Sequence, residues 1–312
     1  MNTVHSTVYR LLNRKGIKLK PVSYLKDKHK DSTCFVDFER EDNSYFYGLL
    51  LADGNLSSLE SRLSKIQITL KSSDKDILLQ FKNFIGTNNK LVSTFQNTDK
   101  GIREYVHIGV NSYTIYNRLI SLGMSPKKSM QEKLPNFDWK NNRHFWRGVV
   151  DGDGSLFYVH GKPKIKLIGS FELLEGFNEF CWKHCFTQKR KLYAESKHEG
   201  LYTISFNGEE ALYVAKVLYF GCDLYLDRKH KLAMEFIDFY KNHRSGLKKG
   251  VSFSKRYNNY VVTLKIKGIR HSLGVFKDYR EALNARINAE VNYYGKCFGE
   301  GKWHSILFHQ LD

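Results

Sequence analysis

Two aspartates, one hundred residues apart, lie near the ends of two closely related stretches of this 312-residue sequence. The first stretch, 46–56, reads Phe-Tyr-Gly-Leu-Leu-Leu-Ala-Asp-Gly-Asn-Leu and contains Asp53. The second, 145–156, reads Phe-Trp-Arg-Gly-Val-Val-Asp-Gly-Asp-Gly-Ser-Leu and contains Asp153. If the two stretches pair, their carboxylates form a hard-oxygen site suited to Mg²⁺ or Mn²⁺. Such an ion also binds substrate phosphates, so the pattern indicates phosphodiester chemistry.

Small residues within each stretch indicate how two helices bring these aspartates together. Gly48 and Ala52 are four residues apart in the first stretch, as are Gly148 and Gly152 in the second. This spacing places each pair on one helix face, and such faces can pack with their backbones nearly in contact. Each helix is followed by a glycine, which we expect to end it in the left-handed conformation.

Both stretches resemble the nine-residue motif of the LAGLIDADG homing endonuclease family, ending one position after each aspartate. The resemblance implies a sequence-specific, metal-dependent endonuclease that hydrolyses phosphodiester bonds on both strands of double-stranded DNA. Asp53 and Asp153 match the eighth position, which holds the metal-binding catalytic acids of the family. The sixth position holds Leu51 in the first copy and Asp151 in the second. Because a residue two positions from Asp153 points off the shared face, we interpret Asp151 as non-catalytic.

A non-cutting nucleic-acid-binding protein, either a transcriptional regulator or an RNA-splicing maturase, is the alternative function. One fold can bind nucleic acid with or without cleaving it. A buried helix that ends in Asp-Gly is also an ordinary structural feature. Two matches with the same surrounding layout, and the presence of both acids, favour the endonuclease.

The sequence around the two stretches repeats at an interval of about one hundred residues, which predicts an internal duplication. Each copy has the pattern helix, two strands, helix, two strands, helix. The predicted fold class is α+β, with duplicated αββαββα repeats that form a pseudo-twofold pair of curved antiparallel sheets, and a small C-terminal domain of three strands and a helix. Such sheets present a long basic surface to the DNA major groove.

Six segments are predicted along the chain. They are a basic N-terminal arm (1–42), a first repeat (43–123), a linker (124–143), a second repeat (144–241), a hinge (242–249) and a DNA-binding domain with its tail (250–312). A short basic helix is predicted at 3–14 in the arm. Two interpretations of this helix stay open, namely contact with DNA phosphates and packing on the main body.

Two strands with alternating polarity supply the residues expected to contact DNA. In the strand 64–71, apolar residues alternate with long polar side chains, so that one face is apolar and the other can read DNA. The strand 164–171 repeats this pattern, with Phe171 expected to point inward. The predicted DNA-contacting residues of these strands are Lys65, Gln67, Thr69, Lys71, Lys164, Lys166 and Ser170.

A basic cluster follows each repeat and supplies a lysine that we predict to act in catalysis. Lys128 lies within Pro-Lys-Lys-Ser at 126–129, and Lys229 lies within Asp-Arg-Lys-His-Lys at 227–231. A lysine beside the scissile phosphate stabilises developing negative charge or tunes the attacking water. The family resemblance places its lysine at these two positions, and a general phosphate contact is the alternative.

The C-terminal segment has the pattern of three short strands and a helix. Gly-Val-Ser-Phe at 250–253, Tyr-Val-Val-Thr-Leu-Lys-Ile at 260–266 and Leu-Gly-Val-Phe at 273–276 resemble the Apetala-type domain of plant ethylene-response factors. The resemblance implies that the sheet reads DNA. Leu273, Val275 and Phe276 are expected in the core of this domain. The basic residues available for DNA are Lys255, Arg256, Lys265, Lys267 and Arg270.

The formal net charge of +18 and the pI of about 9.5 indicate a polyanionic partner, and double-stranded DNA is the partner we expect. The sequence lacks a long apolar span, and residues 1–20 lack the apolar core of a signal peptide. We therefore expect an intracellular protein, in the cytoplasm, nucleoid or an organelle, without a membrane partner. We also expect a monomer without a protein partner, because one chain carries both motifs.

Five cysteines without a Cys-x-x-Cys pair argue against a disulfide framework and a zinc ribbon, and they fit a reducing compartment. Cys181, His184 and Cys185 lie close together on a predicted helix. No fourth metal ligand is apparent near them, and cysteine is commonly a buried apolar residue. The sequence therefore predicts that these cysteines belong to the core.

Overall fold

The computed structural model describes residues 33–57, 64–98, 101–126, 132–185, 187–196, 198–243, 250–266 and 269–294. The helix predicted at 3–14 and the residues Lys128 and Lys267 lie outside these ranges. Within them, the chain has the predicted α+β fold with three antiparallel sheets. No helix in this part of the chain is long and apolar enough to span a membrane.

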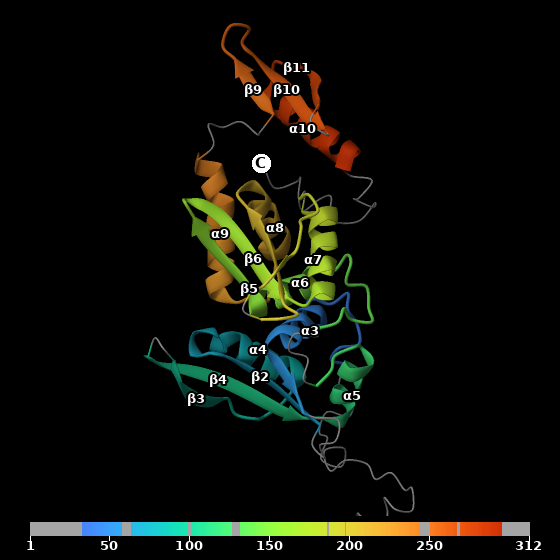
Figure 1. The fold of residues 1–312 in the computed structure, drawn as a ribbon, viewed down its shortest axis with the longest axis vertical. Helices are drawn as coiled ribbons and strands as arrows, with labels where there is room; N and C mark the ends of the chain where they lie inside the picture. Colours follow the sequence, from blue (N-terminus) through green and yellow to red (C-terminus); the bar gives the residue numbers. More distant parts are fainter. Residues whose placement is uncertain are drawn as a thin grey trace, which may run out of the picture.

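The first half of the chain follows the predicted order helix, two strands, helix, two strands, helix (Figure 1). Its strands form one sheet in the order β1-β2-β4-β3. The elements are α3 (Glu41–Asp53), β1 (Gly54–Leu56), β2 (Lys65–Lys71), the 3-10 turn η1 (Ser72–Asp74), α4 (Lys75–Ile85), β3 (Val92–Thr98), β4 (Gly101–Asn111) and α5 (Tyr113–Ser121).

The second half repeats this order, and its strands form a sheet in the matching order β5-β6-β8-β7. Its elements are α6 (Arg143–Asp153), β5 (Gly154–Val159), β6 (Lys162–Gly169), α7 (Phe171–His184), β7 (Tyr193–Ala194), β8 (Tyr202–Asn207), α8 (Glu209–Tyr219) and the additional helix α9 (Asp227–His243). The predicted internal duplication and the predicted fold class are therefore confirmed.

The helix α9 is an element that the sequence analysis did not predict, because it treated 227–231 only as a basic cluster. Ala233 and Phe236 of α9 are fully buried, and Tyr158 of β5 packs edge-on against Phe236. The helix therefore packs against the second sheet. The signal was present in the sequence, since Ala233, Phe236 and Ile237 recur at spacings of three and four.

The helices α3 and α6 cross with their backbones almost in contact, as their small residues predict. A Cβ at Gly48 would overlap the carbonyl oxygen of Phe145, and a Cβ at Gly148 would overlap that of Tyr45. These two contacts are reciprocal, because Tyr45 and Phe145 occupy equivalent positions of the two copies. Only glycine fits at either crossing position, and the helix pair is related by the predicted pseudo-twofold axis.

Gly54 and Gly154 end the two helices in an extended conformation, so the predicted left-handed conformation is wrong. Their φ angles are −81° and −79°, and both ψ angles are 158°. Glycine is needed for space instead, since a Cβ would lie 2.5 Å from the carbonyl oxygen of Leu50 or of Val150. Each glycine N–H donates to that same carbonyl. The chain thus passes directly from each helix into the first strand of a sheet.

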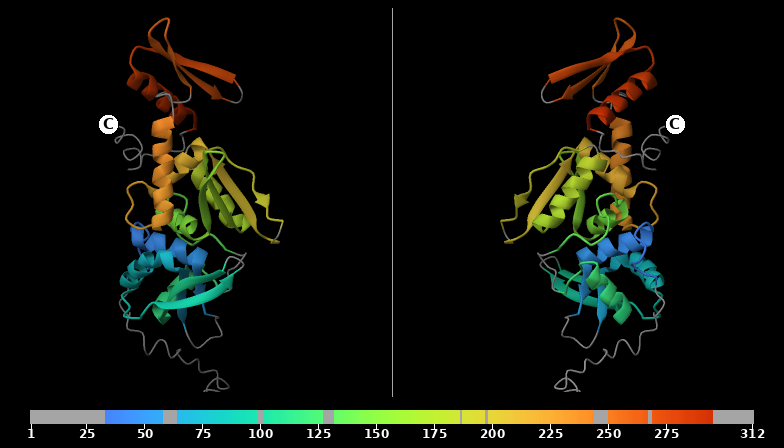
Figure 2. Two further views of the ribbon diagram at one scale, coloured as in Figure 1. Left: turned by 90° about the vertical axis from the view of Figure 1, so that its left-hand side faces the viewer. Right: turned by 90° about the vertical axis from the view of Figure 1, so that its right-hand side faces the viewer.

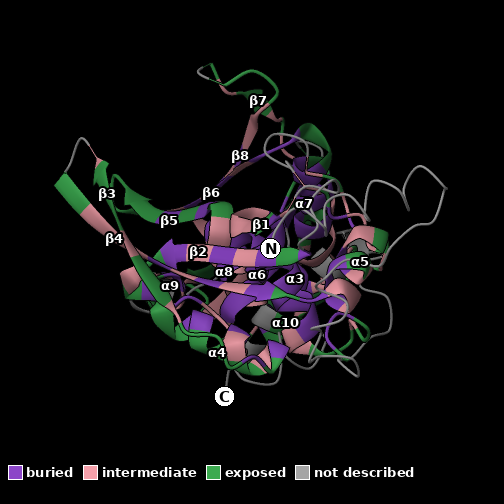
Figure 3. Ribbon diagram, turned by 90° about the horizontal axis from the view of Figure 1, so that it is seen from below, coloured by how far each residue is buried: buried purple, intermediate pink, exposed green. Residues whose placement is uncertain are grey.

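The α3–α6 pair lies between the two sheets and is continuous with both cores. Phe46 and Leu50 of α3, like Trp146 and Val150 of α6, are buried in a single apolar cluster that spans both halves. Both sheets extend to the same side of this pair (Figure 2). Figure 3 shows the buried central helices and the exposed ends of β3 and β4. The helix pair therefore positions the two sheets relative to each other.

The C-terminal unit lies beyond α9 and has the predicted three strands and helix (Figure 1). Its own core contains Val251, Val262 and Ala282, and Leu273 packs against them. Val275, expected in this core, is 58% exposed. The reason is a bulge, because Leu273 is an extra residue in β11 and reverses the alternation of faces beyond it. The elements are β9 (Val251–Ser254), β10 (Asn259–Ile266), β11 (Ile269–Phe276) and α10 (Tyr279–Tyr294).

The variant Gly148→Ala tests the close helix packing. We expect the free energy of unfolding to fall by about 3 kcal/mol, because the added methyl group forces the two backbones apart. Urea denaturation measures this difference. Gly109→Ala is the matched control, since its Cβ would come close only to the flexible end of Lys65, at 2.9 Å, and would make an ordinary contact with the Gln67 side chain at 3.8 Å. Equal stabilities of the two variants would contradict the packing.

Candidate functional site at the joined helix ends

Asp53 and Asp153 are the last residues of α3 and α6, at the point where each helix enters its sheet. One residue earlier, the two helices touch. A Cβ at Gly152 would overlap that of Ala52 and would lie 3.1 Å from Oδ2 of Asp53. Asp53 is half-buried, whereas Asp153 is exposed. The two predicted acids therefore lie near each other at the junction where the two helices enter their sheets, and solvent reaches this junction.

Lys229 is buried in α9 and binds the end of α6. Its Nζ donates to the carbonyl oxygens of Val150 at 2.7 Å and Gly152 at 3.3 Å, and also to that of Asp151. These carbonyls carry the negative end of the helix dipole. An ammonium group has three donors, so the three bonds use all of them. Lys229 therefore stabilises the helix end that carries Asp153.

Charges at the junction affect the pKa of Lys229. Burial lowers this pKa to about 8, while the negative charges of Asp151, Asp53 and Asp153 favour the protonated form. The ammonium group is therefore protonated at neutral pH. Because both predicted acids interact electrostatically with one ammonium group, part of their mutual repulsion is offset.

Asp151 is fully buried and accepts three hydrogen bonds. Its Oδ2 accepts from the Tyr45 hydroxyl at 2.8 Å and from the Leu226 N–H at 2.9 Å, and its Oδ1 accepts from the Tyr219 hydroxyl at 2.7 Å. Burial raises the pKa of Asp151, whereas the charge of Lys229 opposes this shift. The carboxylate thus joins α3, α6 and α8 inside the protein, which fits its interpretation as non-catalytic.

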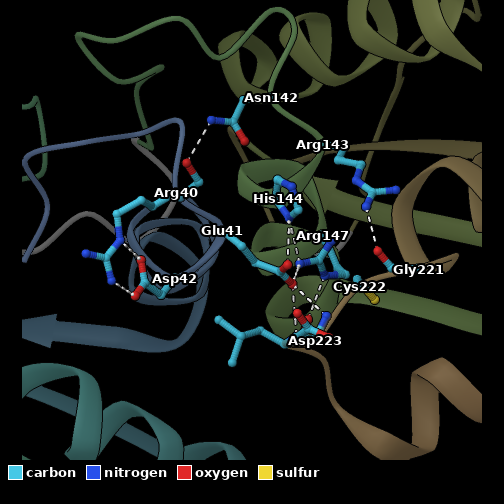
Figure 4. Close-up of polar contacts among 12 residues, drawn as sticks. Arg40, Glu41, Asp42, Asn142, Arg143, His144, Arg147, Gly221, Cys222 and Asp223 are labelled. Atoms are coloured by element: carbon cyan, nitrogen blue, oxygen red, sulfur yellow. Dashed lines mark hydrogen bonds and ion pairs between the residues drawn. The ribbon is translucent and has the colours of Figure 1, made fainter. Parts of the chain in front are cut away.

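A second buried network joins the start of α3 to α6 (Figure 4). Nη2 of Arg147 lies 2.5 Å from Oε1 of Glu41. The same oxygen accepts from the N–H groups of Asp223 and Leu224, both at 2.9 Å. Nδ1 of His144 lies 3.7 Å from the other carboxylate oxygen. Since Glu41 belongs to the first half and its partners to the second, this network fixes the register between the halves.

The ion pair between Asp74 and Arg228 is a third link between the halves. Nε of Arg228, in α9, lies 3.2 Å and 3.0 Å from the two carboxylate oxygens of Asp74, in η1. Sequence reasoning missed this pair and the partners of Glu41 and Asp151. The available signal was a charged residue inside an apolar helix, such as Arg147, because a buried charge needs a partner.

The predicted DNA-contacting residues of β2 share the outer face of the first sheet. Lys65 and Lys71 are exposed, and Gln67 and Thr69 are half-buried. The intervening apolar residues are buried against the helices, as the alternation predicts. The strand pairing places five further residues on this face, because they lie opposite its residues on the neighbouring strands. The sequence analysis did not include them, since the pairing of β2, β4 and β3 was not known from the sequence. They are Tyr105, His107, Arg103, Thr94 and Gln96.

Lys164 and Lys166 lie on the corresponding outer face of β6, and both are half-buried. Nζ of Lys166 lies 2.9 Å from Oε1 of Glu195, so this lysine already has an anionic partner. Serine and threonine side chains of β8 share the face with them. The pairs Lys166 with Ser205 and Ile168 with Thr203 follow from the register.

Ser170 does not lie on the outer face, so its predicted position is wrong. The strand ends at Gly169, and the buried Ser170 caps α7. Its hydroxyl accepts from the Leu173 N–H at 3.3 Å and donates to the Glu132 carbonyl at 2.5 Å. Phe171, expected to point inward, begins the helix and is 53% exposed. The strong preference of serine for helix N-caps accounts for both differences.

Four of the basic residues predicted to contact DNA in the C-terminal unit are exposed. Lys255 and Arg256 occupy the turn between β9 and β10, and Arg256 lies over the ring of Tyr257, 5.3 Å from its centroid. Lys265 and Arg270 are opposite each other on β10 and β11. These residues are available to a polyanion, while Lys267 lies outside the described residues.

No group of three or more His, Cys, Asp or Glu side chains is placed to hold a metal ion among the described residues. Cys181 and Cys185 belong to the apolar core, as predicted. A pair of carboxylates does not suit zinc, which takes three or four protein ligands. The pair Asp53 and Asp153 suits Mg²⁺ or Mn²⁺, since Mg²⁺ uses one or two carboxylates and completes its shell with water and phosphate.

The sequence matches no protein family, and no curated protein is significantly similar to it. Among solved structures, the homing endonuclease I-WcaI bound to its DNA recognition sequence is 11% identical, with 72% of this chain and 92% of that chain covered and a TM-score of 0.44. The I-LtrWI LAGLIDADG homing endonuclease bound to target DNA is 12% identical, with 66% of this chain and 92% of that chain covered and a TM-score of 0.43. The N-terminal LAGLIDADG domain of DUF199/WhiA is 14% identical, with 69% of this chain and 98% of that chain covered and a TM-score of 0.41. At these values the likeness assigns no function to the chain.

The variants Asp151→Asn and Asp153→Asn, two positions apart in α6, should differ in stability. We expect Asp151→Asn to lower the free energy of unfolding by about 3 kcal/mol, because the amide cannot accept all three hydrogen bonds and leaves Lys229 less compensated. Asp153→Asn, at an exposed position, should change it by less than about 0.5 kcal/mol. Urea denaturation at pH 7 measures both. A stable Asp151→Asn variant would show that the buried network is not required.

The free energy of unfolding should also depend on pH through Glu41. Burial opposes its charge, but His144, Arg147 and the Leu224 N–H together lower its pKa to about 2. The stabilisation is present above the unfolded-state pKa of about 4.5 and is lost as pH falls towards 2. Because Glu41 is partly exposed and solvent screens its charge, its contribution to the free energy of unfolding at pH 7 is about 2 kcal/mol.

The variant Glu41→Gln tests this contribution. It should be less stable than the unaltered protein at pH 7, and its stability should fall less steeply between pH 4.5 and 2. Urea denaturation across this range gives both curves. Parallel curves would indicate that Glu41 has an ordinary pKa in the folded protein.

Proposed function

We propose that this protein is a divalent-metal-dependent endonuclease that binds double-stranded DNA with its two sheets and cuts it beside Asp53 and Asp153. The observation that supports this proposal is the contact between Ala52 and Gly152, each of which directly precedes one of the two acids at the end of its helix. A duplex lying along both sheets passes this junction. Each acid would serve the cleavage of one strand, as the resemblance to the LAGLIDADG family implies.

Asp53 and Asp153 would hold the divalent ion, Mg²⁺ or Mn²⁺. When bound, such an ion polarises the phosphate and activates water. The protein contributes position, because both carboxylates extend from helix ends that touch at Ala52 and Gly152. It also contributes charge, since the buried ammonium group of Lys229 offsets part of the negative charge of the acids.

Lys229 acts in this proposal through the end of α6. Its three donors bind backbone carbonyls, so it would hold Asp153 in place and would not itself touch the scissile phosphate. Lys128, the equivalent lysine after the first repeat, stays a predicted catalytic residue. The two halves would therefore use their lysines differently.

DNA binding would extend over both sheets and the C-terminal unit. The net charge of +18 favours a polyanion, and phosphate contacts by lysine and arginine position a duplex. We propose that the segment 250–312 is an Apetala-type domain that lengthens the footprint and that the hinge 242–249 connects it to the second repeat. We further propose an intracellular monomer, since one chain supplies both acids and both sheets.

The double variant Asp53→Asn and Asp153→Asn tests the proposed site. A random duplex library is first selected for binding to the full chain in the presence of chelator, and the selected DNA is then incubated with Mg²⁺. The unaltered protein should cut this DNA on both strands. The double variant should cut at least about a hundredfold more slowly, because it lacks both carboxylates, while its affinity stays within about threefold.

Glu39→Gln is a matched control, because it removes an exposed carboxylate outside the junction. It should leave cutting and binding unchanged. Full activity of the double variant would disprove the site. Binding without Mg²⁺-dependent cutting by the unaltered protein would favour the alternative function, a non-cutting nucleic-acid-binding protein.

A further inference from the structure

The outer faces of the two sheets differ in chemistry at equivalent positions. The glycines that follow the two acids pair with Ile68 of β2 and with Leu167 of β6. This register makes Ile68 equivalent to Leu167, so that Thr69 of the first sheet corresponds to Ile168 of the second. A hydroxyl group in one sheet is thus replaced by an aliphatic side chain in the other.

A second difference lies on the neighbouring strand. The N–H of Ser57 donates to the Lys65 carbonyl at 2.9 Å, whereas Phe157 pairs with Lys164. Because Lys65 and Lys164 are equivalent in the same register, Ser57 corresponds to Phe157. At both positions, the first sheet has a side chain with a hydroxyl group and the second sheet has an apolar side chain.

Apolar side chains of the second sheet are accessible on this outer face. Phe157 is 37% exposed and Val159 is 38% exposed, while Tyr158 between them points to the opposite face and packs against Phe236. Ile168 is half-buried. The outer face therefore carries accessible apolar groups beside the lysines of β6.

We infer that the second sheet reads thymine in the major groove through apolar contacts of Phe157 and Ile168 with the C5-methyl group. This inference rests on the proposed binding of double-stranded DNA. The thymine methyl is the apolar group on the edges of base pairs in the major groove, and apolar side chains contact it favourably. Placing the polar edge of a G·C pair against Phe157 would leave donors and acceptors without partners.

The neighbouring residues fit this assignment. Lys164 pairs with Phe157 and can reach phosphates, which position a duplex without reading its sequence. In the first sheet, Gln67 and Thr69 offer hydrogen-bond donors and acceptors instead. The target is therefore two unlike half-sites, with thymines concentrated in the half that the second sheet binds.

A binding selection from random duplexes with the full chain identifies the preferred site. The decisive measurement then replaces each thymine of this site by deoxyuridine, which removes only the methyl group. In one half-site, affinity for the unaltered protein should fall roughly three- to fivefold for each methyl in contact. The other half-site should respond less.

The double variant Phe157→Ser and Ile168→Thr carries the residues of the first sheet at both positions. Its preference for the thymine duplex should be clearly smaller than that of the unaltered protein, because serine carries no methyl group and threonine carries a single one. It should bind the deoxyuridine duplex about as well as the unaltered protein does. The latter result also shows that the variant is folded. Phe95→Ser is the matched control. Phe95 is 70% exposed, but it shares the face of Ser93, which pairs with the core residue Val106. This variant should keep the sensitivity to deoxyuridine.

Four results would count against this inference or its premise. Equal binding of both duplexes by the unaltered protein would overturn it, as would a double variant that keeps the full sensitivity. Selection of a site whose two halves contain thymine equally often would also overturn it. Failure to select any duplex would instead disprove the proposed DNA binding, which separates the two conclusions.

Discussion

The contact between the backbones of α3 and α6 is the constraint on which the rest of the structure depends. At Gly48 and Gly148 no side chain separates the helices, and any larger residue would overlap a carbonyl group. The distance between the helices is therefore set by backbone atoms, which do not change rotamer. Since Ala52 and Gly152 touch directly before the two acids, this contact also sets the separation of the helix ends.

The two copies differ where the second carries α9. Leu51 is a core residue, whereas its equivalent Asp151 binds two tyrosine hydroxyls and an N–H group. The presence of Lys229 explains this difference. A buried ammonium group is costly unless a negative charge lies nearby, and Asp151 is the largest favourable charge acting on it. Asp151 and Lys229 thus form one unit, which accounts for an acid at position 151 where the first half has Leu51.

Local patterns predicted most of the fold, because alternation along strands and the spacing of glycines in helices depend on near neighbours. The position of the two acids followed from the same spacing. The conformation of Gly54 depended on crowding by a carbonyl, and the burial of Ser170 depended on where β6 ends, so neither followed from spacing alone. The partners of Lys229 are backbone carbonyls, which leave no trace in a sequence. Cross-half pairs such as Glu41 with Arg147 required the three-dimensional arrangement.

Small residues alone would not hold the acids opposite each other. A row of glycine and alanine has few side chains that resist sliding, and a slip of one turn moves a helix end by about 5.4 Å. Such a slip would separate Glu41 from Arg147 and Tyr45 from Asp151. Leaving a buried charge without its partner costs about 3–5 kcal/mol, whereas apolar contacts are readily exchanged for others. The buried polar groups therefore specify the register of the helix pair, and the small residues specify its distance. Both are needed to keep the two carboxylates close together.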